Sequence, residues 1–359
     1  DVYKRQEYNT GLDASFLKGK LRFTVDVYQK YIKDLLQKKV KMPTSIGYGN
    51  GYEVSYMNSG KMTNKGWEFR VDAVPFENRD WRVGFYFNIA HNENKITEMP
   101  DNYTEENYTF NNGEYAYRRE EGRPMGSFYG YRYKGVCQNK DATYARDADG
   151  NVMKDISGNA IVMRNGTATI APGDALYEDI NHDGVINQYD IVYLGNSNPR
   201  FTGGAGVNVS YKQFKLSAIF YGRYGQDVVN STRLNNESMR GIDNQSTAVL
   251  RRWRNEGDQT DIPRALYGEG YNTLGSDRFV EDASYLRLKS LSFNYRLPKK
   301  IIQRWGFSNI DVYVTGYNLF TWTKYTGQDP EVKTENTYAR DSATTPASIQ
   351  LVAGFNLSF

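Results

Sequence analysis

Several segments of the chain alternate apolar and polar residues, which is the pattern of β-strands that expose two different surfaces. In Leu21–Val27 the odd positions are apolar and the even positions are polar, and Glu7–Leu17 alternates in a similar way. Lys18–Lys20 supplies a short turn between the two segments, so together they predict a hairpin. A tilted strand of about ten residues can cross a bilayer, with one face toward lipid and the other toward water.

A second predicted hairpin pairs Gly66–Val74 with Trp81–Ile89 across the turn Glu77–Asp80. Three successive positions on the polar face of its first strand are charged, namely Glu68, Arg70 and Asp72. Unpaired charges are costly in the closed core of a β-sandwich but are stable beside a water-filled lumen. The pattern therefore favours a barrel wall over a sandwich.

We predict an all-β protein, part of an antiparallel up-and-down transmembrane β-barrel, with about ten strands in this chain. The other predicted strands are Ser127–Val136, Gly204–Tyr211, Phe214–Arg223, Tyr285–Leu297, Asn309–Trp322 and Ser348–Phe359. The apolar phase slips at Lys289 and Ser290, which predicts a β-bulge, and Pro298–Gly306 predicts a helical turn. We expect one meander with alternating short and long connections. Its convex face should carry Leu21, Phe23, Val25, Trp67, Phe69 and Val71.

Composition supports a barrel because the chain is rich in aromatic residues but not in apolar residues as a whole. Aromatic residues make up 14% of the 359 residues and apolar residues only 39%, below the 45–50% typical of soluble domains. No run of about 18 apolar residues occurs, so a transmembrane helix is not expected. The net charge of +3 is dispersed, which argues against a nucleic-acid partner. The single cysteine, Cys137, and two histidines do not form a zinc-binding pattern.

Six short phrases together resemble the C-terminal barrel of SusC/RagA-type TonB-dependent outer-membrane transporters. They occur in family-like order along nearly the whole chain. They are Asn64–Phe69, Gly122–Pro124 with Gly126–Tyr131, Asn198–Phe201, Tyr285–Leu288, Asn318–Thr321 and Tyr325–Glu331.

The resemblance implies a larger barrel of about 22 strands with an N-terminal plug and a TonB-contacting segment. It implies a multi-pass β-barrel in the cell outer membrane of a Bacteroidetes species, TonB-dependent uptake of oligosaccharides or peptides, and a SusD-like surface lipoprotein as lid. TonB, the barrel-assembly machinery and outer-membrane lipid are further implied partners. We expect residues 7–359 to be the C-terminal part of such a barrel and residues 1–6 to be a non-native or disordered start. The strand near Tyr8–Phe16 should be an edge that lacks its neighbours.

A twelve-residue segment, Asp179–Asp190, matches the calcium-binding loop of EF-hands. Oxygen ligands at the pattern's spacing are expected from Asp179, Asn181, Asp183, the Val185 carbonyl, Asn187 and Asp190. Gly184 occupies the sharp turn, and Asp190 stands where Glu is usual. We predict a structural Ca²⁺ that braces an extracellular loop. The alternative is a turn rich in Asp and Asn that binds no metal.

No catalytic residue is predicted, because no recognisable nucleophile, base or phosphate-binding loop occurs. The leading interpretation is therefore a nutrient importer, not an enzyme. Two alternatives remain: a secreted soluble β-protein that binds carbohydrate and carries a calcium loop, and an outer-membrane barrel enzyme. Four loop tyrosines could stack on a sugar, but packing of the loop is the stronger interpretation: Tyr103, Tyr108, Tyr115 and Tyr117.

The final segment alternates apolar and small or polar residues up to its terminal aromatic ring. This pattern predicts a lipid-facing strand, with the ring at the membrane interface. It also resembles the signal that the barrel-assembly machinery recognises. The predicted signal residues are Phe355, Leu357 and Phe359.

Overall fold

The computed structural model describes residues 4–41, 53–58, 60–99, 113–116, 119–268, 271–332, 334–335 and 338–359. Its main element is a nine-stranded sheet whose strands follow one another in chain order. The strands are β1 (Lys4–Phe16), β2 (Leu21–Lys33), β5 (Lys61–Glu77), β6 (Trp81–Glu98), β14 (Phe201–Tyr211), β15 (Phe214–Tyr224), β18 (Tyr285–Arg296), β19 (Asn309–Thr323) and β22 (Gln350–Ser358).

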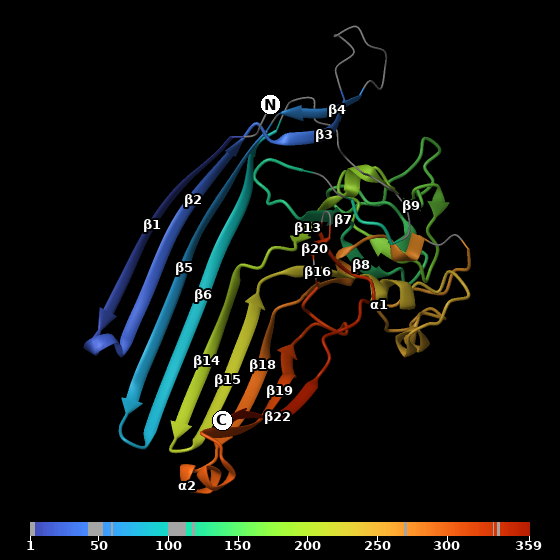
Figure 1. Ribbon diagram of the computed structural model, residues 1–359. Coiled ribbons are helices and arrows are strands. Elements are labelled where there is room, and N and C mark those ends of the chain that lie inside the picture. The colour runs from blue at the N-terminus through green and yellow to red at the C-terminus, as the bar shows by residue number, and fades with distance from the viewer. Residues whose placement is uncertain are drawn as a thin grey trace.

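Every neighbouring pair in this sheet is antiparallel, so the predicted meander is confirmed (Figure 1). The register pairs Phe23 with Val71 and Val25 with Phe69. Directly paired residues share a face of the sheet, so the predicted apolar set lies together. We call this the outer face and the opposite one, which carries Arg70 and Asp72, the inner face.

The connections alternate in length as predicted. At one end of the sheet, short links join β1 to β2, β5 to β6 and β14 to β15, while long segments leave the opposite end. The helix α2 (Lys299–Ile302), followed by a 3-10 turn over Gln303–Trp305, forms the predicted helical link at the short end. The register of β18 shifts between Leu288 and Ser290, which confirms the bulge.

The strand count differs from the prediction. Ser127–Val136 is not a wall strand: it divides into β7 (Ser127–Gly130) and β8 (Tyr133–Val136), which pair with strands outside the main sheet. All four residues of β7 are buried, so both of its faces are covered. Apolar alternation cannot distinguish such a strand from one in a barrel wall. Lys4 already pairs with Lys33 in β1, and the expectation of a non-native or disordered start at residues 1–6 stays a prediction.

The long segments gather into one loop cluster at the end of the sheet opposite α2 (Figure 1). Its small sheets consist of β7 with β13 (Val192–Asn196), β8 with β11 (Ala175–Tyr177), β9 (Arg164–Asn165) with β10 (Ala168–Thr169) and β12 (Val185–Ile186), and β16 (Asp227–Asn230) with β17 (Val280–Asp282), β20 (Thr334–Glu335) and β21 (Tyr338–Asp341). A separate hairpin joins β3 (Leu36–Lys41) to β4 (Glu53–Asn58), and the helix α1 (Ser231–Asn236) follows β16. Among the described residues, no helix is long and apolar enough to cross a membrane.

Within this chain the sheet remains open. Among the strands that the structure describes, β1 pairs only with β2 and β22 pairs only with β19, so both are edges. This confirms the prediction that the strand near Tyr8–Phe16 is an edge. Open edges of this length are uncommon in proteins that fold alone, because unpaired backbone groups favour further strand pairing.

Candidate functional site

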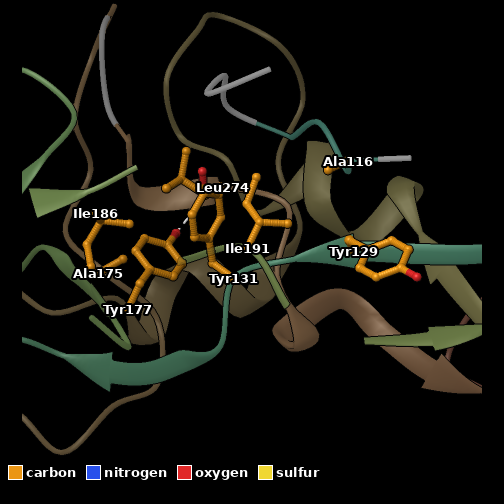
Figure 2. Close-up of a cluster of buried hydrophobic side chains, with 8 residues drawn as sticks. All are labelled: Ala116, Tyr129, Tyr131, Ala175, Tyr177, Ile186, Ile191 and Leu274. Carbon is orange, nitrogen blue, oxygen red and sulfur yellow. Dashed lines mark hydrogen bonds between the residues drawn. The ribbon is translucent and has the colours of Figure 1, made fainter. Parts of the chain in front are cut away.

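The loop cluster has closed hydrophobic cores of its own. Figure 2 shows the largest, in which Tyr131, Tyr177 and Leu274 pack at the centre and the backbone N–H of Leu274 donates to the Tyr177 hydroxyl over 3.0 Å. Ile186, from the predicted calcium loop, is fully buried in the same core. The loop is therefore anchored by packing on one side, where Asp190 is also buried, while Asn181 and Asp183 are exposed.

The predicted calcium loop adopts a compact turn. Gly184 has a φ of +82°, the left-handed conformation that the pattern expects of a glycine at the sharp turn. The backbone N–H of Asp183 lies 3.2 Å from Oδ1 of Asp179 and 3.2 Å from Oδ1 of Asn181, so these two side chains converge. The backbone N–H of Gly184 donates to Asp179 Oδ2 over 2.8 Å.

Asp190 closes this loop from its far end. Its Oδ1 accepts the N–H of Ile180 and its Oδ2 accepts the N–H of Asn187, each over 2.8 Å. Burial raises the pKa of the Asp190 carboxyl, and the negative charges of Asp179 and Asp183 raise it further, although the two hydrogen bonds oppose the shift. The carboxylate of Asp190 thus joins the two ends of the loop by accepting from their backbone N–H groups.

Two other predicted ligands are occupied by local hydrogen bonds. Asn187 donates from its amide to the Val185 carbonyl over 3.0 Å and accepts from the N–H of Tyr189. Within the part of the chain that the structure describes, no group of three or more His, Cys, Asp or Glu side chains is placed to hold a metal ion. Calcium coordination by this loop therefore remains a prediction.

Three of the six phrases that carry the resemblance meet where the sheet joins the loop cluster. Asn198 donates to the Met125 carbonyl over 2.6 Å, and the N–H of Met125 donates to Asn94 Oδ1 over 2.7 Å. Asn94 in turn donates to Asn64 Oδ1 over 2.8 Å. This amide chain, Asn198–Met125–Asn94–Asn64, ties two loop segments to the inner face of β5 and β6. Sequence reasoning singled out both ends but missed Asn94.

The other three phrases meet in an ion network around Arg287, whose side chain is 3% exposed. Its guanidinium donates to Asp329 over 2.5 Å, to Glu331 over 2.8 Å and to the Thr321 hydroxyl over 2.8 Å. Lys289 also contacts Glu331 at 2.8 Å. The network fastens the loop after β19 to the strand β18. The sequence pointed to this network, because Arg287 and its partners Asp329 and Glu331 lie in phrases that carry the family resemblance.

Asp329 is held in its ionised form by this arrangement. Burial alone would raise the pKa of its carboxyl, but hydrogen bonds from the N–H groups of Ala347 and Glu331, together with Arg287, lower it below the usual value. The charged form of Asp329 is thus the form that holds the loop.

The two faces of the sheet differ in chemistry. On the inner face Arg70 forms a two-pronged contact with Asp72, and Thr24 donates to Asp13 over 2.6 Å. The outer face exposes large apolar side chains on every wall strand from β14 to β22, among them Val207, Leu216, Phe293, Phe320, Trp322 and Phe355. An exposed apolar surface of this extent marks a membrane or a protein interface.

Of the four loop tyrosines considered for sugar stacking, the structure describes only Tyr115. Tyr115 is 7% exposed, donates its hydroxyl to the Ser276 carbonyl over 2.7 Å and packs against Phe128. This side chain therefore packs the loop core and is not presented to a ligand. Tyr103, Tyr108 and Tyr117 lie outside the described residues.

The predicted signal residues lie on the outer face of β22 or at its end. Phe355 is 67% exposed and Phe359 is 89% exposed, and Leu357 lies on the same side of the strand. The Phe359 ring lies 5.0 Å from that of Phe307, next to the helical link at the short end. These side chains thus share the exposed apolar face of the neighbouring wall strands, and their contact with lipid stays a prediction.

Comparison with known proteins places these features in a wider group. The chain is 31% identical over 341 residues to TonB-dependent receptor P3 of Formosa agariphila, an alignment covering 92% of this chain and 31% of that protein. It is 26% identical over 366 residues to TonB-dependent receptor SusC of Bacteroides thetaiotaomicron, covering 99% of this chain and 32% of SusC. No protein-family model matches the chain.

The fold is shared with solved structures. The RagAB peptide transporter matches 99% of this chain and 35% of its own, with a TM-score of 0.70 and 27% identity. The RagAB peptide importer in the closed-closed state matches with a TM-score of 0.69 and 26% identity. The chain thus spans about a third of the length of the proteins it matches.

Proposed function

This chain belongs to the SusC/RagA type of TonB-dependent receptors, and from that premise we propose that the whole protein imports nutrients across the outer membrane. The chain forms part of the wall and the mouth of the importing barrel. One observation carries the proposal: an antiparallel meander with an apolar outer face and a charged inner face matches RagAB over 99% of the chain.

The exposure of the outer face supports the membrane location over a secreted soluble protein. A soluble β-protein would have to cover side chains such as Phe320, which is 61% exposed, and Leu351, which is 76% exposed. In a bilayer these side chains contact lipid without cost, and the edges at β1 and β22 pair with the remaining strands of a closed barrel. The relatives are named as receptors and transporters, which supports transport over an enzymatic role.

We propose oligosaccharides or peptides as the cargo. Oligosaccharides are proposed because the chain resembles the SusC/RagA family and SusC is among its relatives. Peptides are proposed because the matching RagAB structures are those of a peptide transporter. Uptake of labelled oligosaccharides and labelled peptides should be measured in cells that carry or lack the full-length protein. One class should enter only with the protein present, and a protonophore should abolish that entry. Uptake that ignores both the deletion and the protonophore would refute TonB-dependent import.

The partners follow from the same proposal. A SusD-like lipoprotein would close over the loop cluster, whose positions are fixed by the amide chain and by the Arg287 network. TonB would act through an N-terminal segment of the kind that the resemblance implies. Co-purification of a surface lipoprotein with the tagged full-length receptor tests the first partner. Its absence from receptor purified in mild detergent would count against a lid.

We also propose that Asp179–Asp190 binds one structural Ca²⁺. The donor set is wholly oxygen, which suits calcium, and Asp179 and Asn181 already converge on one backbone N–H. Binding would require Asp190 to exchange a backbone hydrogen bond for the ion. Calorimetry on the full-length protein should show calcium binding that Asp183→Ala removes. The control is Asp147→Ala in a neighbouring glycine turn, where Asp147 accepts from the N–H of Asn151. The absence of calcium binding to the unaltered protein would end this proposal.

A last proposal concerns Phe355, Leu357 and Phe359 as the segment that the barrel-assembly machinery recognises. Their exposed positions on one side of β22 leave them available to a partner before insertion.

A further inference from the structure

A groove of about 670 Å³ interrupts the outer face of the sheet near the loop cluster. Its floor is formed by the small residues Gly203, Ala205 and Gly222 on β14 and β15. Its walls are larger side chains from strands on either side, Phe87 and Ile89 on β6 and Leu286 and Trp322 on β18 and β19. The register places these residues on the outer face, because Ala205 pairs with Phe87 and Gly203 pairs with Ile89.

The floor glycines also have a structural reason to be small. A Cβ on Gly203 would lie 2.5 Å from the Asn88 carbonyl oxygen, and one on Gly222 would lie 2.7 Å from that of Tyr285. Neighbouring backbone therefore excludes a side chain at both positions. Ala205 is the floor position at which a larger side chain can be introduced into the groove.

We propose that this groove binds one acyl chain of an anionic lipid from the membrane leaflet nearest the loops. This inference rests on the proposed membrane location of the sheet. On β14 the groove extends from Phe201 to Ala205, about 13 Å at about 3.3 Å per residue. That length is about half of the roughly 30 Å hydrocarbon core, which matches an acyl chain confined to one leaflet. A protein partner that packs along the whole wall would not require a groove limited to half its height.

Charge at the rim selects the headgroup. Lys324 directly follows β19 at the loop end of the groove and is exposed. Among the described acidic side chains, none lies within ion-pair distance of its ammonium group. Asp282 also lines the rim, but its carboxylate accepts from the N–H and the hydroxyl of Ser284. Arg223 also lines the groove, but it is half-buried and its Nε donates to the Tyr221 hydroxyl. The exposed ammonium of Lys324 is thus the cation at the rim that can best reach a lipid phosphate.

The test uses the full-length receptor in detergent, titrated by native mass spectrometry with phosphatidylglycerol and with phosphatidylcholine of the same acyl chains. Ala205→Phe fills the groove and should weaken binding of one phosphatidylglycerol at least tenfold, about 1.4 kcal/mol. Ala218→Phe is the matched control, because Ala218 lies on the outer face of β15 outside the groove. It should bind lipid as the unaltered protein does.

Lys324→Gln gives an independent arm. It should weaken phosphatidylglycerol binding about fivefold and leave phosphatidylcholine binding unchanged. Equal lipid binding by Ala205→Phe and the unaltered protein would overturn the inference. It would also be overturned if the unaltered protein were a dimer and Ala205→Phe separated the two copies without reducing lipid binding, because the groove would then be a protein interface. Failure of the membrane location itself looks different: the protein would then fractionate away from membranes and show no heat-modifiable migration.

Discussion

The loop cluster buries its large apolar side chains, whereas the sheet exposes many of its own on one face. The fully buried side chains lie mainly in the loop cluster, as Phe128, Tyr129, Phe279 and Leu274 show. The sheet has a long antiparallel ladder, yet many of its large apolar residues face outward. The loops therefore pack like a small soluble protein, whereas the sheet exposes an apolar face and two edges, which the proposed barrel would cover with lipid and further strands.

The loop cluster has a core of its own and is joined to the sheet by polar contacts. The amide chain through Asn94 and the ion network around Arg287 connect a self-packed unit to the wall. Such ties set where the cluster lies without contributing its core. A loop cluster held in a fixed position is what the proposed importer and its proposed lid would require.

The largest expected effect is cavity formation in the loop cluster. Phe279→Ala should destabilise the cluster by about 3–5 kcal/mol, because the ring is fully buried and lies beneath two guanidinium groups. Hydrogen exchange of the β16 and β17 amides in the full-length protein measures the loss. Phe293→Ala on the sheet is the control, because its ring is 45% exposed and leaves no internal cavity. Similar effects of both changes would break the comparison.

A charge on the outer face should be the next most damaging change. Val207→Arg near the middle of β14 should cost about 2–4 kcal/mol of folding stability in a bilayer. Asn208→Arg places the same charge on the inner face one residue away and should cost much less. Folding into phospholipid vesicles across a urea series compares the two variants. Equal loss would mean that lipid does not contact the outer face.

Breaking the Arg287–Asp329 ion pair should loosen the loop after β19 but leave the sheet intact. Asp329→Asn should cost about 1.5–3 kcal/mol, because buried Arg287 loses a charged acceptor. Protease cleavage within residues 324–348 should become faster. Lys289→Gln is a milder control, since Lys289 is partly exposed, pairs with Glu331 and lies over the Tyr221 ring without contacting Asp329 among the described ion pairs. Unchanged cleavage in Asp329→Asn would show that the network does not hold the loop.

The same tie should weaken in acid. Folding lowers the pKa of Asp329, so its contribution is fully present above the ordinary carboxyl value of about 3.9 and is lost as pH falls through the lowered value. Cleavage of the loop by an acid-stable protease should therefore rise below about pH 4. Asp329→Asn should flatten that rise. If cleavage of Asp329→Asn still rose in acid as it does in the unaltered protein, protonation of other carboxylates would be the cause.

The smallest effect is expected at the end of the chain. Phe359→Ala removes the ring contact with Phe307 and should lower the assembled, membrane-embedded fraction without changing synthesis. The change in stability should stay near 1 kcal/mol, the scale of one aromatic pair. Ser358→Ala, on the polar side of the same region, is the control. Equal assembly of both variants would remove Phe359 from the proposed signal.

Local pattern was enough to predict the wall. Alternation with a period of two specifies which residues share a face, so the hairpins, the bulge near Lys289 and the outward position of Phe69 could all be predicted from the sequence. The left-handed turn at Gly184 could also be predicted from the sequence, because few residues other than glycine adopt that conformation.

Tertiary structure alone decided where segments with similar patterns belong. The segment Ser127–Val136 was predicted as a wall strand, but its first part, β7, is buried on both faces in the loop cluster. The groove likewise depends on Gly203, Ala205 and Gly222 meeting across two strands. The partners of Arg287 lie more than 30 residues away, so the network exists only once the chain has folded. Sequence periodicity records which way a side chain faces, whereas only the folded chain determines what it meets.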